Sequence, residues 1–220
     1  MSYNFSFEKL WVVEDSAPLR AVVMQLVASL ARNVEGAGSY ADCDALLHAT
    51  GRPDAIVCDH DLPDGTAMDV ASLFTRDNLP RLVALTASTD SQVHEALKAS
   101  GFAQVVQKPV RAAELREALN IKGTSVREVA IPAELQERYV RFVAEETRAI
   151  AAAYACLSAP KLIHHLHKLA GTASVYGDKP LALAATACEA RLRDGEPLSW
   201  LRRELTQLFE SAGGPSRLAS

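Results

Sequence analysis

The first half of the chain alternates short apolar runs with segments in which apolar residues recur at helical spacing. The apolar runs occupy residues 10–13, 34–37, 55–58, 82–85 and 105–106. Runs of this length between helical segments are typical of strands buried on both faces of a parallel sheet. Helical spacing follows Ser16, a candidate N-cap, and recurs near residues 41–49, 67–74, 91–99 and 111–119. The pattern therefore predicts an α/β fold with a five-stranded, doubly wound parallel sheet.

Polar side chains follow four of these five runs, at the point where each predicted strand ends. Glu14 and Asp15 follow the first run, Asp59 the third and Thr86 the fourth, and Lys108 comes just after the last. Ligands of open α/β sheets bind outside the carboxyl ends of the strands. We therefore expect these five side chains to lie together at one edge of the sheet.

This set of side chains suits phosphoryl chemistry. Three carboxylates in one place repel one another unless a cation neutralises them, and their hard oxygen atoms favour Mg²⁺. Lys108 supplies a second positive charge for phosphoryl oxygens, and the Thr86 hydroxyl supplies a hydrogen bond. Asp59, in the middle of the set, is a candidate nucleophile that forms an aspartyl phosphate.

The segments around these residues resemble the receiver domain of two-component response regulators. They are residues 13–15 (Val-Glu-Asp), 59–65 (Asp-His-Asp-Leu-Pro-Asp-Gly), 85–87 (Leu-Thr-Ala) and 108–109 (Lys-Pro), within a resemblance that covers residues 8–120. Combined in this order, the segments are highly specific for that family. The resemblance implies a flavodoxin-like fold with Asp59 as the residue that accepts phosphate.

The same resemblance assigns roles to the other residues. Glu14 and Asp15 would help to hold Mg²⁺, with a further metal contact from the backbone carbonyl of Asp61. Thr86 and Lys108 would grip the phosphoryl group. One position departs from the family: many receivers carry an aromatic residue shortly before the lysine, where this chain has Val105. The absence of the aromatic ring argues against a conformational change, driven by phosphorylation, in the surface around the last strand.

The alternation of strands and helices stops after residue 121. Residues 122–131 are mostly polar and precede Pro132, which favours a linker. The rest of the chain carries four apolar stripes at helical spacing, one of them over residues 161–176. Breaks between the stripes fall near residues 158–160, 177–180 and 194–197. We therefore predict an α/β domain at 1–121, a linker at 122–131, an antiparallel four-helix bundle at 132–212 and a flexible tail at 213–220.

The helix predicted over residues 161–176 carries three histidines. His167 lies about 140° around the helix from the centre of its apolar stripe, which predicts a position near solvent, with Gly171 one turn further. His165 flanks the stripe and is expected to be partly buried, and His164 is expected at the surface. The three histidines could also be read as a metal cluster, although His164 and His167 alone share a face.

Residues 167–173 (His-Lys-Leu-Ala-Gly-Thr-Ala), followed by Gly177, resemble the signature of histidine phosphotransfer (HPt) domains. The resemblance covers residues 132–212 and implies that His167 carries phosphate on a ring nitrogen. Many members of that family have lysine where this chain has Ala170, and Lys168 is a candidate source of the missing charge. Whether Thr172 or Ser174 orients the histidine or a partner stays open.

Composition and missing motifs exclude several classes of function. A net charge of −4 without a basic block argues against a nucleic-acid surface. No glycine-rich phosphate loop precedes a helix, so phosphate must come from a partner. The absence of a signal peptide and of a long apolar stretch favours a cytoplasmic protein without membrane insertion. The four scattered cysteines are expected to be buried free thiols in a reducing compartment.

These features predict a phosphorelay protein rather than an enzyme with turnover. Its partners would be a sensor histidine kinase, other receivers or other HPt proteins; its oligomeric state stays unassigned. One alternative is an interaction module in which phosphorylation of Asp59 only alters docking and His167 is inert. Another is a haloacid-dehalogenase-type phosphatase, whose motif begins Asp-x-Asp. In that class the acidic pair comes after the motif, whereas here Glu14 and Asp15 precede it.

Overall fold

The computed structural model describes residues 5–121 and 131–212, with side chains up to residue 208. The chain divides into two compact units, Met1–Ala130 and Ile131–Ser220. Residues 122–130 of the predicted linker and the predicted tail at 213–220 lie outside the described residues.

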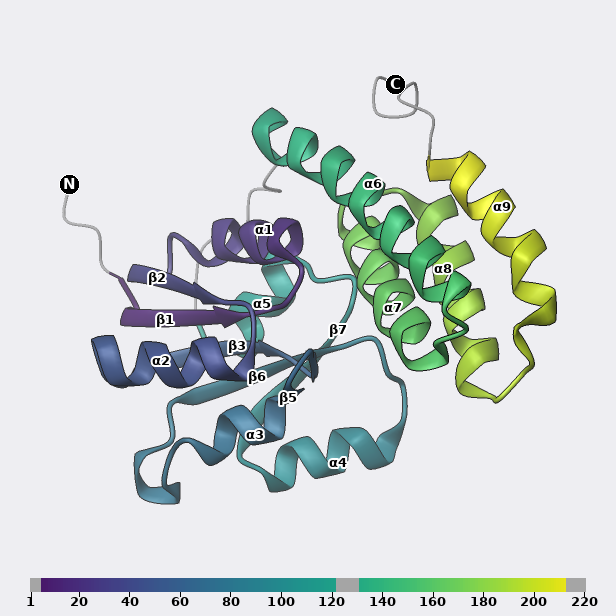
Figure 1. Ribbon diagram of the computed structural model, residues 1–220. Helices are drawn as coiled ribbons and strands as arrows, with labels where there is room; N and C mark the ends of the chain where they lie inside the picture. The colour runs from purple at the N-terminus through teal and green to yellow at the C-terminus, as the bar shows by residue number, and fades with distance from the viewer. Residues whose placement is uncertain (1–4, 122–130, 213–220) are drawn as a thin grey trace. The chain divides into compact units, whose positions relative to one another are not determined.

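The first unit is built on a parallel sheet (Figure 1). Its five strands lie in the order β2-β1-β3-β6-β7. They are β1 (Phe7–Val13), β2 (Ala31–Ala37), β3 (Ala55–Asp59), β6 (Arg81–Thr86) and β7 (Phe102–Gln107). All five strands predicted from the apolar runs are present, each longer than its run. Strand β1 lies between β2 and β3, and Val13 pairs with Cys58. The carboxyl ends of β1 and β3 therefore lie side by side.

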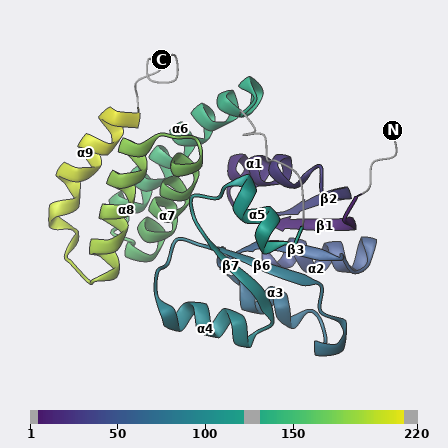
Figure 2. The same cartoon turned by 180° about the vertical axis from the view of Figure 1, so that it is seen from behind.

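Helices cover both faces of this sheet. The set is α1 (Ala17–Val27), α2 (Tyr40–Thr50), α3 (Ala67–Ser72), α4 (Ser91–Ala99) and α5 (Ala112–Ala118). Figure 2 shows α1 and α5 on one face, with α2, α3 and α4 on the other. As the sequence predicts, Ser16 caps α1, with its hydroxyl accepting the backbone N–H of Leu19 and Pro18 in the first turn.

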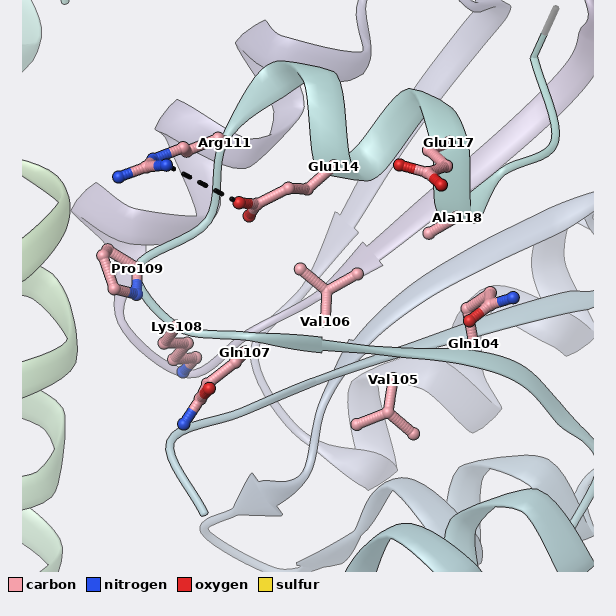
Figure 3. Close-up of a pocket in the computed structure, with 10 residues that line it drawn as sticks. All are labelled: Gln104, Val105, Val106, Gln107, Lys108, Pro109, Arg111, Glu114, Glu117 and Ala118. Atoms are coloured by element: carbon pink, nitrogen blue, oxygen red, sulfur yellow. Dashed lines mark ion pairs between the residues drawn. The ribbon is translucent and has the colours of Figure 1, made fainter. Parts of the chain in front are cut away.

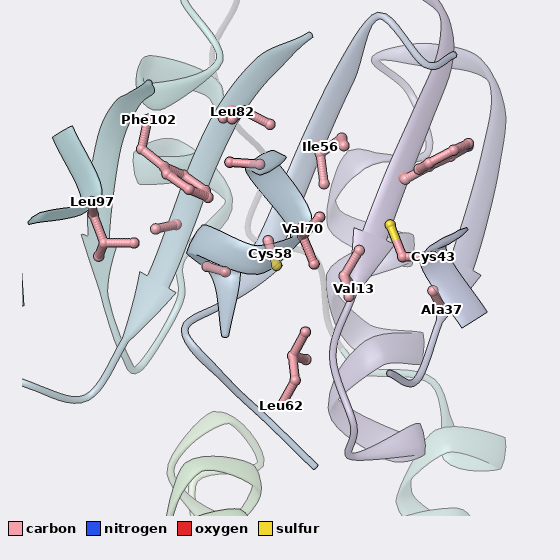
Figure 4. Packing of buried hydrophobic residues seen from close by; sticks show 14 residues of the cluster. Val13, Ala37, Cys43, Ile56, Cys58, Leu62, Val70, Leu82, Leu97 and Phe102 are labelled. Atoms are coloured by element: carbon pink, nitrogen blue, oxygen red, sulfur yellow. The ribbon is translucent and has the colours of Figure 1, made fainter. Parts of the chain in front are cut away.

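The core beneath α2, α3 and α4 explains why the central strands β3 and β6 are apolar over most of their length. Figure 4 shows Ile56, Cys58 and Leu82 of the sheet packed with Val70 of α3 and Leu97 of α4. All five side chains are fully buried. Strands packed on both faces have no solvent side, so they lose the alternation of apolar and polar residues seen in half-exposed strands.

Two short elements interrupt the simple alternation. A two-stranded antiparallel hairpin, β4 (Asp61–Leu62) and β5 (Gly65–Thr66), follows β3, and a 3₁₀ turn, η1 (Arg76–Asn78), precedes β6. Neither was predicted from the sequence, because segments of two or three residues carry no periodic signal. The hairpin holds the residues that follow Asp59 next to the end of the sheet.

The second unit is helical over the residues that the structure describes. It contains α6 (Ala133–Ala155), α7 (Ala159–Val175), α8 (Lys179–Arg193), a 3₁₀ turn η2 (Leu198–Trp200) and α9 (Leu201–Ala212). Helix α7 packs against α6 and α8, and α9 packs against α8 and α6. The apolar residues of the predicted stripes are buried, except for Leu198, the first residue of the last predicted stripe, which is partly exposed. Within the described residues, no helix has both the length and the apolar composition needed to cross a bilayer.

One expectation about the cysteines is wrong. Cys43, Cys58 and Cys188 are buried free thiols, but Cys156 is exposed. Cys156 directly follows the last residue of α6, in the turn that leads to α7.

Candidate functional site

The carboxyl ends of the parallel strands bring acidic and basic side chains together. The ammonium nitrogen Nζ of Lys108, after β7, lies 2.8 Å from Oδ2 of Asp59, the last residue of β3. It also lies 3.0 Å from Oε2 of Glu14, the residue after β1. Glu14, Asp15 and Asp59 each offer an oxygen atom within 4.8 Å of the others. The sequence-predicted cluster is therefore assembled at one edge, as expected.

Backbone hydrogen bonds extend the sheet past the last strand residues and hold this cluster in place. The amide N–H of Glu14 donates to Ala37 O at 3.0 Å. The amide of Lys108 donates to Thr86 O at 2.8 Å. Because the backbone of Glu14, Asp59, Thr86 and Lys108 belongs to the hydrogen-bonded ladder, these four side chains project from rigid elements rather than from loops.

Burial makes the charges of the cluster interdependent. Burial raises the pKa of Glu14, but Lys108 and the amide of Ser16 outweigh this effect and leave the pKa below its ordinary value of 4.5. Burial likewise opposes the charge of Lys108, and the attraction of Asp59 and Glu14 raises its pKa above the ordinary value. Both groups are therefore charged at neutral pH.

The donor set fits a hard divalent cation. When ionised, three carboxylates outnumber the single ammonium of Lys108 by two negative charges, and the donor atoms are all oxygen. Among the residues that the structure describes, Glu14, Asp15 and Asp59 are the group close enough to share an ion. The alternative interpretation of His164, His165 and His167 as a metal cluster is therefore not supported.

Thr86 lies at the end of β6, the strand next to β3, and Asp61 follows Asp59 closely in the chain. Thr86 ends β6, is 1% exposed, and its hydroxyl oxygen accepts the amide of Ser88 at 3.0 Å. Asp61 begins the β4–β5 hairpin, two residues past Asp59. Asp64, which belongs to the same motif, serves the fold instead: its carboxylate accepts the backbone amides of Tyr40 and Ala41 at 2.7 and 3.0 Å.

A cavity of about 440 Å³ opens between β7 and α5 (Figure 3). Val105 lines it, half-buried, and also contacts the core beneath α4. On the α5 side Glu114 and Glu117 line the cavity. At the position where many receivers carry an aromatic ring, this chain therefore has a small aliphatic side chain in regular pairing with Ala84 of β6.

The second candidate residue, His167, differs from its expected setting. Its side chain is only 13% exposed, and its Nδ1 lies 3.0 Å from Oε1 of Glu189 on α8. The expectation of a solvent-facing histidine is therefore wrong. The helical periodicity of α7 places His167 away from that helix's own apolar stripe, but it carries no information about α8, which presents Glu189 to this side.

Glu189 and its neighbour Arg193 are functional candidates that sequence reasoning missed. Both Nε and Nη2 of Arg193 lie 2.9 Å from Oε1 of Glu189. Burial raises the pKa of Glu189, but hydrogen bonding from His167 and then from Arg193 outweighs it and lowers the pKa. The spacing of Glu189 and Arg193 at i and i+4 is visible in the sequence, but it is equally typical of an ordinary ion pair on a helix surface.

Two neighbours of His167 on α7, His165 and Lys168, contact a carboxylate of α6. The buried carboxylate of Glu146 lies 2.8 Å from Nδ1 of His165 and 3.3 Å from Nζ of Lys168. His165 is partly buried, as expected. The interpretation of Lys168 as a charge beside His167 is not supported, since its ammonium group lies over the Phe142 ring, 5.9 Å from the centroid. Thr172 is buried, and its hydroxyl donates to Lys168 O.

A family model and several solved structures match the first unit. The family model for the response regulator receiver domain matches residues 10–120. A DNA-binding response regulator of the LuxR family from Staphylococcus aureus is 20% identical, with a TM-score of 0.46 over 51% of this chain and 96% of that chain. A response regulator receiver domain protein from Methanospirillum hungatei JF-1 is 18% identical, with a TM-score of 0.46 over 52% and 92% of the two chains. No curated protein matches the chain.

Proposed function

The chain belongs to the response regulator receiver domain family through residues 10–120, and on this premise we propose that it is a phosphorelay protein with two phosphoryl-accepting residues, Asp59 and His167. Receiver domains interact with histidine kinases and other signalling proteins. The partners we propose are therefore a sensor histidine kinase, other receivers or other HPt proteins. The transfer is stoichiometric rather than a turnover of small phosphate esters.

The chemistry at Asp59 follows from the cluster around it. A carboxylate oxygen of Asp59 attacks the phosphorus of the donor, a P–O bond forms, and the bond to the donor's leaving group breaks with its electron pair. Lys108, 2.8 Å from this carboxylate, stays beside the phosphoryl oxygens as their counter-charge. The Thr86 hydroxyl, at the adjacent strand end, donates a hydrogen bond to them.

Receiver domains bind Mg²⁺ at an acidic pocket, and the residues present fit that ion. Glu14, Asp15 and Asp59 would hold it through carboxylate oxygens, with the backbone carbonyl of Asp61 as a further ligand. The ion would neutralise charge on the phosphoryl oxygens. Lys108 already bridges Glu14 and Asp59, so the cluster is partly neutralised before any cation binds.

The contact between His167 and Glu189 supports the second acceptor. A carboxylate only accepts hydrogen bonds, and the pKa of Glu189 is lowered, so Nδ1 of His167 is the donor across 3.0 Å. A neutral ring with its proton on Nδ1 has its lone pair on Nε2, which is then the nucleophile. Attack of Nε2 on the aspartyl phosphate breaks the P–O bond to the carboxylate, which leaves with the electron pair. No proton has to leave the ring.

We assign the helices of the second unit to an antiparallel four-helix bundle of the HPt class. Short turns between α6, α7 and α8 favour antiparallel neighbours. Gly177, with φ of +78°, makes the turn after α7 in a conformation that glycine adopts without strain. The single observation that carries the proposal is the histidine of the HPt-like segment seated against Glu189, on the same chain as a receiver cluster.

The proposal is tested by intact-protein mass after incubation with acetyl phosphate and Mg²⁺. The full chain is compared with Asp59→Asn, His167→Ala and the matched control His164→Gln. We expect a phosphoryl adduct that requires Asp59 and is destroyed by hydroxylamine. We also expect a second form, acid-labile and resistant to hydroxylamine, that requires His167 but not His164.

Two results would contradict parts of this proposal. An adduct that persists in Asp59→Asn would show that another carboxylate accepts phosphate. An Asp59 adduct with no His167 form, even with phosphorylated partner present, would favour the alternative in which phosphorylation only controls docking.

A further inference from the structure

One carboxylate oxygen on α8 is shared by a histidine and an arginine. Oε1 of Glu189 lies 3.0 Å from Nδ1 of His167 and 2.9 Å from both Nε and Nη2 of Arg193. The guanidinium group is always charged and only donates hydrogen bonds. His167 therefore never faces the full negative charge of Glu189, because Arg193 offsets part of it.

The other cations near this site have different partners. Position 170, where many HPt domains have lysine, is an alanine that is 8% exposed. Lys168 pairs with Glu146 on the α6 side of the helix. Arg191, two residues before Arg193, pairs with Glu196 at 2.7 Å and stacks on Trp200. In the described part of α8, Arg193 is thus the cation that shares a partner, Glu189, with His167.

We propose that Arg193 is a positioning residue for phosphotransfer, which acts through Glu189 to keep the His167 ring neutral with its proton on Nδ1. The inference rests on the proposed role of His167. An ionised Glu189 without Arg193 would be neutralised most readily by a second proton on His167. That proton would occupy the lone pair of Nε2, and a protonated imidazole is no nucleophile. By sharing the carboxylate, Arg193 allows Glu189 to orient the ring without charging it.

Other charged groups around α7 contact partners other than Glu189, so Arg193 is the group that offsets its charge. Helix α7 packs against α6 and α8. Among the described residues, the charged and titratable groups with recorded contacts at this helix include Glu146 and Tyr139 from α6, Glu189 and Arg193 from α8, and His164, His165, Lys168 and Tyr176 at α7 itself. Glu146 is engaged by His165 and Lys168. Burial, and then His165, lowers the pKa of His164, which keeps that ring uncharged at neutral pH.

The test is a titration of the His167 ring by long-range ¹H–¹⁵N NMR on the full chain. Wild type is compared with Arg193→Gln, Arg193→Lys and the matched control Arg191→Gln, with His167→Gln used to assign the signals. Because Arg193 is about half exposed, solvent weakens its effect, and we expect the midpoint to rise by about one pH unit in Arg193→Gln. Arg193→Lys should restore most of the wild-type value, and Arg191→Gln should leave it unchanged.

Transfer from Asp59 to His167 supplies the functional readout. In Arg193→Gln the rate should fall about tenfold below the new midpoint, and stay within about twofold of wild type at high pH, where the ring is neutral in both. Equal slowing at every pH, or a midpoint equal to that of Arg191→Gln, would overturn the role of Arg193. Absence of any label on His167 in wild type would instead overturn the proposed function, while the titration would still report on Arg193.

Discussion

Nζ of Lys108 lies 2.8 Å from Oδ2 of Asp59, although the two residues stand 49 positions apart in the chain. Both side chains are almost fully buried, at 4% and 2% exposure. A buried ammonium is stable only with an anionic partner, and Asp59 and Glu14 together provide one. The same contact that supports the fold therefore leaves the ammonium in place for phosphoryl oxygens.

Removing the charge of Lys108 should destabilise the first unit. Lys108→Gln leaves Glu14 and Asp59 buried without their cation, and we expect a loss of about 3 kcal/mol in the free energy of unfolding. Urea unfolding followed by Trp11 fluorescence, in a Trp200→Phe background, measures this. Added Mg²⁺ should recover more stability in Lys108→Gln than in wild type. The exposed residue Lys98, changed to Gln, is the control, and an equal loss there would contradict the argument.

Stability of the first unit should depend on pH through Glu14. Its folded-state pKa is lowered from 4.5, so the folded state binds fewer protons than the unfolded chain. The contribution is complete above the unfolded value and is lost as pH falls through the folded value. Glu14→Gln should flatten the fall in unfolding free energy below about pH 4.5. An unchanged slope between about pH 5 and pH 3 in that variant would show that other carboxylates are responsible.

Phosphorylation of Asp59 should move the surface around the cavity of β7 and α5 very little. Val105, half-buried in regular pairing with Ala84, is too small to couple the cluster to that surface by swinging in or out. We expect amide shifts on phosphorylation to centre on Thr86 and Lys108. Large shifts over Glu114 and Glu117 would contradict this and indicate a conformational output.

The two buried glutamates of the helical unit should have separable effects. Glu189→Gln replaces a carboxylate that only accepts hydrogen bonds by an amide that can also donate, so the proton of His167 is no longer held on Nδ1, and labelling of His167 should fall at least about tenfold with little loss of stability. Glu146→Gln removes the charge that holds His165 and Lys168, so it should cost about 1–3 kcal/mol and leave His167 labelled. Labelling assays and urea unfolding on both variants measure these quantities. Similar labelling in the two variants would remove Glu189 from the site.

The turn after α7 should tolerate substitution poorly. Gly177 has φ of +78°, and a Cβ added there would lie more than 4 Å from the described atoms of other residues, so the cost of a side chain is backbone strain alone. We expect Gly177→Ala to lose about 1 kcal/mol and Gly177→Asn to lose less, since asparagine enters this conformation more readily. Thermal unfolding of both variants measures the difference. Equal losses would point to a packing effect instead.

Local patterns in the sequence predicted much of this protein. Apolar runs at residues 10–13, 55–58 and 82–85 predicted buried strands, because a strand covered on both faces has no polar positions. The rule that strand ends meet at one edge then predicted that Asp59 and Lys108 lie together. The β4–β5 hairpin and the role of Asp64 escaped prediction, since two-residue strands have no period and a carboxylate cap depends on a distant helix end.

The α/β class and the acidic cluster with its lysine were determined by the sequence alone, because each follows from a pattern within one element and a general rule for parallel sheets. The surroundings of His167 were decided only by tertiary structure. Periodicity describes a helix relative to its own apolar stripe, whereas Glu189 reaches the ring from α8, 22 positions away. Which helix covers which face depends on packing, so the pairing of His167, Glu189 and Arg193 is readable only once α7 and α8 are side by side.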